Sequence, residues 1–178
     1  MVTNSRALAD EITDFTGGIE PTVVYPCVGD DLVDAASDLA QISNDLRPTL
    51  SLLTVGRLVG RKGHIKVLEA IKGLPDINYV IVGDGPERNK INQAIEYFKL
   101  SVRVKIITEV KDNQLANFYR QADVFIMPSI KSKDDREGFG IVYLEAGLFG
   151  LPVIATNQPG VDEAVLDGQT GLLIDGSV

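Results

Sequence analysis

The stretch that decides the fold is LSLLTVGRLVGRKGHIKVLEAI, residues 50–71. Its first six residues, Leu50–Val55, are apolar at nearly every position, which is typical of a strand buried on both faces. A glycine-rich turn follows, and then Ile65, Leu68 and Ile71 recur at helical spacing. A buried strand, a short turn and an amphipathic helix together predict one βα unit of a parallel sheet.

The same alternation continues to the end of the chain. Five further apolar runs are predicted to be strands: Tyr79–Val82, Val104–Ile107, Val124–Met127, Pro152–Ala155 and Gly171–Ile174. Apolar residues at helical spacing lie between them: Ile91, Ile95 and Phe98; Leu115, Phe118 and Tyr119; Val142, Ala146 and Phe149. The predicted fold class is therefore α/β, a doubly wound (Rossmann-like) parallel sheet of about six strands flanked by helices. Ligands are expected at the carboxyl ends of the strands.

The first fifty residues follow a different pattern. Ser5–Phe15 is interpreted as a short helix, Thr22–Tyr25 as a strand, and Asp34–Asp45 as a second helix or a linker. No strand is expected before the first helix. At the other end, Asp175–Val178 follows a strand without the helix that should cover it, so both ends of the chain look cut.

The composition restricts the possible partners. A chain of 178 residues with 44% hydrophobic residues fits one domain with a real core. The formal net charge of −8 argues against nucleic acid, but a small phosphorylated ligand needs only a few local cations. Met1–Asp14 is unlike a signal peptide, and no apolar run could span a bilayer. The single cysteine, Cys27, fits a reducing compartment, so a cytoplasmic location is expected.

A basic, glycine-rich turn links the first predicted strand to its helix. Its sequence, GRLVGRKG at 56–63, holds the three cations Arg57, Arg61 and Lys62. Glycines let the backbone approach a ligand closely, and N–H groups at a helix start suit an anion. The turn is not a phosphate-binding P-loop, because the spacing differs and no Ser or Thr follows Lys62. A solvated basic turn remains the alternative.

A second turn, GDGPER at 83–88, follows the second strand. It superficially matches a dinucleotide-binding fingerprint, but the third glycine is absent. Pro86 suits the first position of a helix. A tight strand-to-helix turn is therefore the favoured interpretation of Gly83 and Gly85, and direct ligand contact is the alternative.

The most informative motif is EGFGIVYLE at 137–145. A helix is predicted to begin near Gly140, and its free N–H groups would face an anion. Glu137 precedes that helix and Glu145 lies about one and a half turns into it, so the two carboxylates are not placed to share proton chemistry. The favoured interpretation assigns them to two hydroxyl-bearing parts of one ligand. A capped helix with two solvated carboxylates is the alternative.

These motifs in combination resemble the family 4 retaining glycosyltransferases, which have the GT-B architecture of two Rossmann-like domains. The resemblance covers about residues 22–176. It is most specific at Glu137 and Glu145, which have seven residues between them like the pair in that family's hallmark motif. The chain departs from the family at two places: the family often has glycine at the position of Thr108 and a Gly-Gly pair at that of Pro159-Gly160.

The resemblance implies roles for thirteen residues. The catalytic set is Arg57, Lys62 and Glu137. The donor-binding set is Gly56, Gly83, Gly85, Val110, Leu115, Gly138, Phe139, Gly140, Ile141 and Glu145. By this resemblance the two cations bind the donor diphosphate, Glu137 contacts the transferred sugar and Glu145 the ribose. The backbone from Gly138 to Ile141 holds sugar hydroxyls and phosphate, while Val110 and Leu115 flank the base.

The resemblance also implies a division into domains. Residues 1–21 would be a remnant of an N-terminal acceptor-binding domain, and residues 22–178 the nucleotide-sugar-binding domain, truncated at its C-terminal end. Because GT-B catalysis takes place between the domains, this chain alone is expected to bind a nucleotide sugar weakly and to transfer none. The loop at 130–136 is similar to that of mannosyltransferases that use GDP-mannose, so the donor is expected to be a UDP- or GDP-sugar, with mannose a faint preference.

The sequence also bears on cofactors, on the acceptor and on alternative functions. No cofactor or metal is expected, since the only histidine, His64, lies in no ligand cluster. The acceptor would be a glycan or a lipid-linked molecule, and membrane contact would come only through the missing half. A non-catalytic nucleotide-binding scaffold and a nucleotide-sugar epimerase of the same fold are the alternatives. A nicotinamide-dependent oxidoreductase is disfavoured, because no Gly-x-Gly-x-x-Gly follows the first strand.

Overall fold

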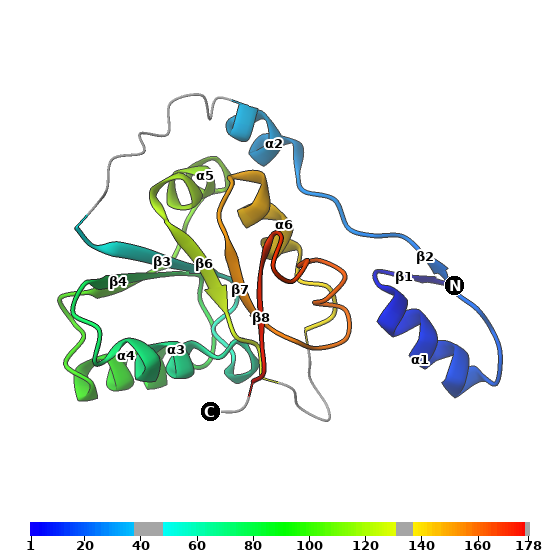
Figure 1. The fold of residues 1–178 in the computed structure, drawn as a ribbon, viewed down its shortest axis with the longest axis horizontal. Helices are drawn as coiled ribbons and strands as arrows, with labels where there is room; N and C mark the ends of the chain where they lie inside the picture. Colours follow the sequence, from blue (N-terminus) through cyan, green and yellow to red (C-terminus); the bar gives the residue numbers. More distant parts are fainter. Residues whose placement is uncertain (38–47, 131–136, 177–178) are drawn as a thin grey trace.

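A six-stranded parallel sheet forms the centre of the computed structural model, which describes residues 1–37, 48–130 and 137–176 (Figure 1). The strand order is β5-β4-β3-β6-β7-β8, and every neighbouring pair is parallel. The strands are β3 (Leu50–Val55), β4 (Ile77–Val82), β5 (Val104–Ile107), β6 (Val124–Met127), β7 (Val153–Thr156) and β8 (Gly171–Ile174). All six predicted strands are confirmed, with shifts of one or two residues at the ends of β4 and β7.

Helices cover both faces of this sheet, as Figure 1 shows. Helices α3 (His64–Ile71) and α4 (Arg88–Tyr97) lie on one face, whereas α2 (Asp30–Ser37), α5 (Asp112–Gln121) and α6 (Ile141–Leu148) lie on the other. Each face has its own cluster of buried apolar side chains. The predicted doubly wound α/β class is therefore confirmed, and it is the fold expected of one half of a GT-B enzyme. No helix in the described ranges is long and apolar enough to cross a membrane.

The strand order indicates where a ligand should bind. β3 lies in the middle, between β4 and β6, so the connections after β3 and β6 leave on opposite faces of the sheet. Ligands of open α/β sheets bind outside the carboxyl ends of the strands where the order reverses. In this chain that position lies between Gly56, which follows β3, and Pro128, which follows β6.

The N-terminal residues form a separate small unit, drawn apart from the sheet in Figure 1. It consists of β1 (Val2–Thr3), α1 (Arg6–Thr16) and β2 (Thr22–Val23), with the two strands parallel. The predicted helix is confirmed, and Ser5 caps it by accepting a hydrogen bond from the Leu8 N–H at 3.2 Å. The expectation of no strand before this helix was wrong. β1 has two residues, too few to show any periodicity, and its partner lies about twenty residues farther along.

The other N-terminal predictions have mixed outcomes. The predicted strand at 22–25 is shorter, because only Thr22 and Val23 pair with β1. The second helix, α2, begins at Asp30 instead of Asp34, and residues 38–45 of that prediction lie outside the described residues. The domain boundary between residues 21 and 22 stays a prediction.

A glutamate from the C-terminal part of the chain caps helix α1. The Glu163 carboxylate accepts hydrogen bonds from the Arg6 and Ala7 N–H groups at 2.8 and 2.9 Å, and from the Tyr25 hydroxyl at 2.8 Å. Burial acts to raise the pKa of Glu163, but these N–H donors, Tyr25 and the Arg6 charge outweigh it, and the pKa lies below its ordinary 4.5. This contact is therefore fully formed above about pH 4.5 and weakens as the pH falls through the lowered pKa.

Candidate functional site

A buried carboxylate shared by two cations forms the centre of the site. The Lys62 Nζ and the Arg61 Nη1 each lie 2.5 Å from the Glu137 Oε2. Lys62 and Glu137 are both 7% exposed. Two cations therefore meet one carboxylate at the carboxyl end of the sheet. Cations gathered at one place can attract an anion even in a chain that is acidic overall.

Glycine geometry brings these residues together. Lys62 ends a short 3₁₀ helix, Gly60–Lys62, and Gly63 follows it with φ of 73°. A Cβ at Gly63 would lie 2.2 Å from the Pro128 carbonyl oxygen, so only glycine permits this approach. The Ile130 N–H also donates to the Arg61 carbonyl at 2.6 Å. The turn after β3 is thereby held against the end of β6, which places Lys62 beside Glu137.

The other residues of the basic turn make different contacts. A Cβ at Gly56 would lie 3.6 Å from the Lys62 Cε, so the lysine side chain runs along this glycine. The Arg57 side chain is exposed and makes no ion pair in the part of the chain that the structure describes. Its catalytic role stays a prediction. Arg61, to which the sequence analysis gave no role, pairs with Glu137 instead. The local sequence does not indicate which of the two arginines pairs with Glu137, because side-chain direction in a single 3₁₀ turn depends on tertiary contacts.

Two predicted donor-binding glycines have a packing explanation. A Cβ at Gly83 would lie 2.0 Å from the Gly56 carbonyl oxygen, and one at Gly85 would lie 2.5 Å from that of Leu58. The turns after β3 and β4 therefore pack backbone against backbone, and any larger residue would force them apart. This accounts for both glycines without a ligand, and their contact with a donor stays a prediction.

The N-terminus of α6 faces the same end of the sheet. Gly140 is the N-cap residue with φ of 77°, and no side chain caps the helix. The N–H groups of Ile141 and Val142 donate no hydrogen bond to any residue in the described ranges. Uncapped N–H groups and the positive end of the helix dipole together favour an anion. The predicted helix start near Gly140 is confirmed.

Glu145 has a partner of a different kind from that of Glu137. It is half-buried on α6, and its Oε2 accepts a hydrogen bond from the Tyr119 hydroxyl at 2.6 Å. Burial raises the pKa of Glu145, and the hydrogen bond from Tyr119 opposes that rise. One glutamate is therefore held by cations and the other by a phenol. This agrees with the interpretation that the two carboxylates do not share a proton.

The predicted base-flanking residues lie just before and within α5. Val110 and Leu115 are half-buried and pack against the core on the α5 and α6 face. Val110 lines a groove of about 440 Å³ together with Thr108 and Gln114, and Leu115 is not part of this lining. The structure thus explains both residues by packing, and their contact with a base stays a prediction.

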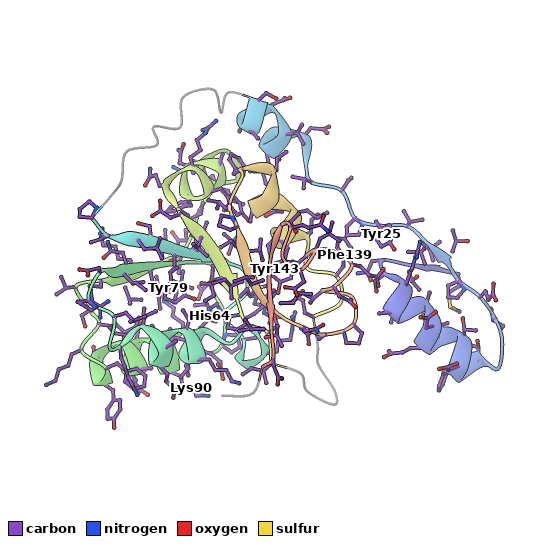
Figure 2. The ribbon with its side chains drawn as sticks, in the orientation of Figure 1. Tyr25, His64, Tyr79, Lys90, Phe139 and Tyr143 are labelled. Carbon is purple, nitrogen blue, oxygen red and sulfur yellow. The ribbon has the colours of Figure 1, made fainter. Side chains whose placement is uncertain are left out.

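The loop before α6 is packed against the N-terminal unit. Phe139 is 4% exposed, and its ring centroid lies 5.5 Å from that of Tyr25 (Figure 2). A Cβ at Gly138 would lie 3.6 Å from the Asn4 side chain. Because both residues precede α6, the position of the predicted donor-binding backbone depends on residues near the start of the chain.

Unpartnered polar groups gather around the carboxyl ends of β3, β6 and β7. The buried side chains that leave polar atoms without a hydrogen bond in the described ranges are His64, Ser129, Thr156 and Gln158. Such groups are rare in proteins, and each needs a specific explanation. Burial, reinforced by Lys62, lowers the pKa of His64 to about 4 against the opposing effects of the Arg57 backbone and Glu87. The imidazole is therefore neutral near pH 7. This cluster could not be predicted from the sequence, because burial of a polar residue is a tertiary property.

Comparison with known proteins gives the family. Residues 41–177, well over half of the chain, match the family described as "Glycosyl transferases group 1". The chain belongs to this family. Membership of the group 1 glycosyl transferases confirms the resemblance inferred from the Glu137–Glu145 motif. It does not support the scaffold and epimerase alternatives.

Curated relatives carry glycosyltransferase names. A GDP-mannose-dependent alpha-(1-6)-phosphatidylinositol monomannoside mannosyltransferase of Mycolicibacterium smegmatis is 36% identical over 74% of this chain and 35% of its own length. A D-inositol 3-phosphate glycosyltransferase of Paenarthrobacter aurescens is 33% identical over 99% of this chain and 45% of its own length. The chain therefore spans less than half the length of these two curated relatives.

Solved structures agree with this fold. The pneumococcal O-GlcNAc transferase GtfA, in complex with UDP and GlcNAc, is similar with a TM-score of 0.74 and 26% identity over 99% of this chain and 34% of its own. Anabaena HepE in complex with UDP is similar with a TM-score of 0.77 and 25% identity over 98% of this chain and 49% of its own. Both of these similar structures contain bound UDP.

Proposed function

We propose that this chain is the donor-binding domain of a retaining glycosyltransferase and holds a nucleoside-diphospho-sugar at the carboxyl ends of β3 and β6. The observation that carries the proposal is the convergence of Lys62 and Arg61 on the buried Glu137, next to the uncapped start of α6. Cations and free N–H groups at one end of a doubly wound sheet suit a diphosphate. The names of the relatives and the nucleotides in the similar structures support the same class of ligand.

The proposed mechanism relies on charge placement. When the sugar leaves its diphosphate, negative charge builds on the departing nucleotide. Lys62 and the N–H groups of Ile141 and Val142 would offset that charge without a metal ion, and exposed Arg57 would supply a second cation. Donor binding would draw Lys62 from the Glu137 carboxylate, which then accepts hydrogen bonds from the transferred sugar. Glu145 would accept from both ribose hydroxyls, because one carboxylate has acceptor sites for two donors.

We further propose a class of donor sugar and a second domain that binds the acceptor. UDP- and GDP-sugars are both candidates, and mannose is favoured by the sequence similarity of the segment at 130–136 and by the name of the mycobacterial relative. Residues 131–136 of that segment lie outside the described residues. The acceptor would be a glycan or a lipid-linked sugar bound by an N-terminal domain. Since the relatives are more than twice as long, we propose that this chain binds donor but needs that domain for transfer. The site would work in the cytoplasm, with membrane contact only through the other half.

The test is a calorimetric titration of this chain with UDP, GDP and ADP and then with their sugar-loaded forms. A hydrogen bond to a charged group is worth ~1.5–3 kcal/mol, so Glu145→Gln should weaken nucleotide binding about tenfold or more. Glu96→Gln is the matched control, because Glu96 is exposed on α4 and lies far along the chain from the site. The proposal fails if no nucleotide binds at millimolar concentration, or if Glu145→Gln binds as tightly as the unaltered chain.

A further inference from the structure

A buried tyrosine lies directly behind Glu145. Tyr119 is 0% exposed on α5, and its hydroxyl donates to the Glu145 Oε2 at 2.6 Å. Its ring is stacked on that of Phe149, with centroids 5.3 Å apart and planes 10° apart, and on that of Phe125 at 6.2 Å and 28°. The ring is therefore held between two aromatic neighbours, which fixes where its hydroxyl points.

The two oxygens of the Glu145 carboxylate have different surroundings. The Oε2 is occupied by Tyr119, and the Oε1 accepts no hydrogen bond from any residue in the described ranges. A phenol donates a single proton, so Tyr119 satisfies one oxygen and leaves the other for a further donor. A hydroxyl donor on a bound ligand would complete the carboxylate.

Charged neighbours have little effect on the pKa of Glu145. Burial raises the pKa of Glu145 and the hydrogen bond from Tyr119 opposes that rise, and no charged side chain in the described part of α2, α5, α6 or β7 acts on the carboxyl. Arg120, the next residue on α5, is directed to the Ala35 carbonyl and the Phe149 ring. The acidic residues of α2 are exposed, and β7 has no titratable side chain. Burial also raises the pKa of Tyr119, so the phenol keeps its proton through neutral pH.

We infer that Tyr119 is the positioning residue for Glu145, holding one carboxylate oxygen so that the other accepts from the vicinal hydroxyls of the nucleotide's ribose. The inference rests on the proposed function, because it takes the ligand to be a ribonucleotide. It adds a specificity element to the site: the chain distinguishes ribose from deoxyribose through a pair, Tyr119 and Glu145, of which only Glu145 touches the ligand.

The test compares Tyr119→Phe with Tyr79→Phe. Tyr79 is also 0% exposed, and its hydroxyl lies 2.7 Å from the Thr54 Oγ1, in the core on the opposite face of the sheet. Each variant loses one buried hydroxyl, so both should melt a few degrees below the unaltered chain. The probes are UDP, GDP and their 2′-deoxy forms, titrated by calorimetry between about pH 5 and pH 9.

Tyr119→Phe should weaken ribonucleotide binding about tenfold and 2′-deoxynucleotide binding much less. The acid side of its binding profile should move to higher pH, because the hydrogen bond that favours the ionised carboxyl is gone. Tyr79→Phe should leave affinity and pH profile unchanged. If Tyr119→Phe does not fold, replacing all tyrosines with 3-fluorotyrosine, a stronger donor, should move the acid side to lower pH.

Two outcomes overturn the inference alone. One is unaltered binding in Tyr119→Phe. The other is an equal loss for ribo- and deoxyribonucleotides with an unmoved pH profile, which would make Tyr119 a packing residue. If instead Glu145→Gln binds ribonucleotides normally, the proposed ribose contact is wrong, and the role of Tyr119 is wrong with it.

Discussion

Replacing Gly160 with alanine is expected to lower the free energy of unfolding by about 2–5 kcal/mol and to abolish nucleotide binding. Gly160 has φ of 91°, a backbone conformation that residues with a Cβ rarely adopt. A Cβ there would lie 1.7 Å from the Gly138 carbonyl oxygen, far closer than any real contact. Relief of that clash must move Gly138, and Gly138 belongs to the loop that sets the start of α6. The loss of binding thus follows from displacement of the site.

Gly168→Ala is the matched control for this prediction. Gly168 has φ of 70°, but a Cβ there would have no atom within 4 Å. It carries the backbone strain without the clash, so it should cost about 1–2 kcal/mol and leave affinity intact. Urea unfolding and calorimetric titration measure the two effects. Equal losses in both variants would show that backbone strain alone decides the outcome and that Gly160 has no special relation to the site.

Replacing Lys62 with methionine is expected to reduce nucleotide affinity about ten- to a hundredfold. The lysine ammonium lies 2.5 Å from the Glu137 carboxylate, and both are buried. Removing one partner of a buried ion pair costs about 3–5 kcal/mol when the other is left alone. Because Arg61 still pairs with Glu137, the loss of stability should fall at or below the lower end of that range.

A double variant separates stability from binding in this case. Lys62→Met with Glu137→Gln removes both charges of the pair, so it should recover much of the lost stability. It should not recover affinity, because the cation proposed to bind the diphosphate is still absent. Lys90→Met is the control, since Lys90 is exposed and its pairing with Glu87 is a surface contact of little energy. Recovered affinity in the double variant would mean that Lys62 serves only to neutralise Glu137.

The sheet could be predicted from the sequence because each strand carries its own evidence. β3 is apolar throughout and a glycine turn follows it, so the strand and the direction of the chain after it are both visible locally. β1 could not be predicted, since its two residues form a strand only by pairing with Thr22 and Val23. The unit β1–α1–β2 is specified by long-range contacts such as the cap from Glu163, which no local pattern reveals.

The site was predicted in part for a similar reason. Sequence motifs named Lys62 and Glu137 but not their pairing, which depends on the approach of Gly63 to Pro128. Tyr119 was recognised only as part of an apolar helix face, because its contact with Glu145 depends on how α5 and α6 are aligned. The resemblance assigns Arg57 to the catalytic set, but its side chain is exposed. Arg61, four residues farther along the chain, is the arginine that reaches Glu137.

We propose that a nucleoside diphosphate binds between Lys62 and the start of α6. The most direct measurement is an amide NMR titration of this chain with UDP and GDP, with assigned resonances. Saturable shifts are expected, concentrated at Gly56, Lys62, Ile141 and Val142 and weakened by Lys62→Met. Shifts centred instead on the groove of about 570 Å³ at the other end of the strands, lined by Gly150 among others, would contradict it, as would no shift at millimolar nucleotide.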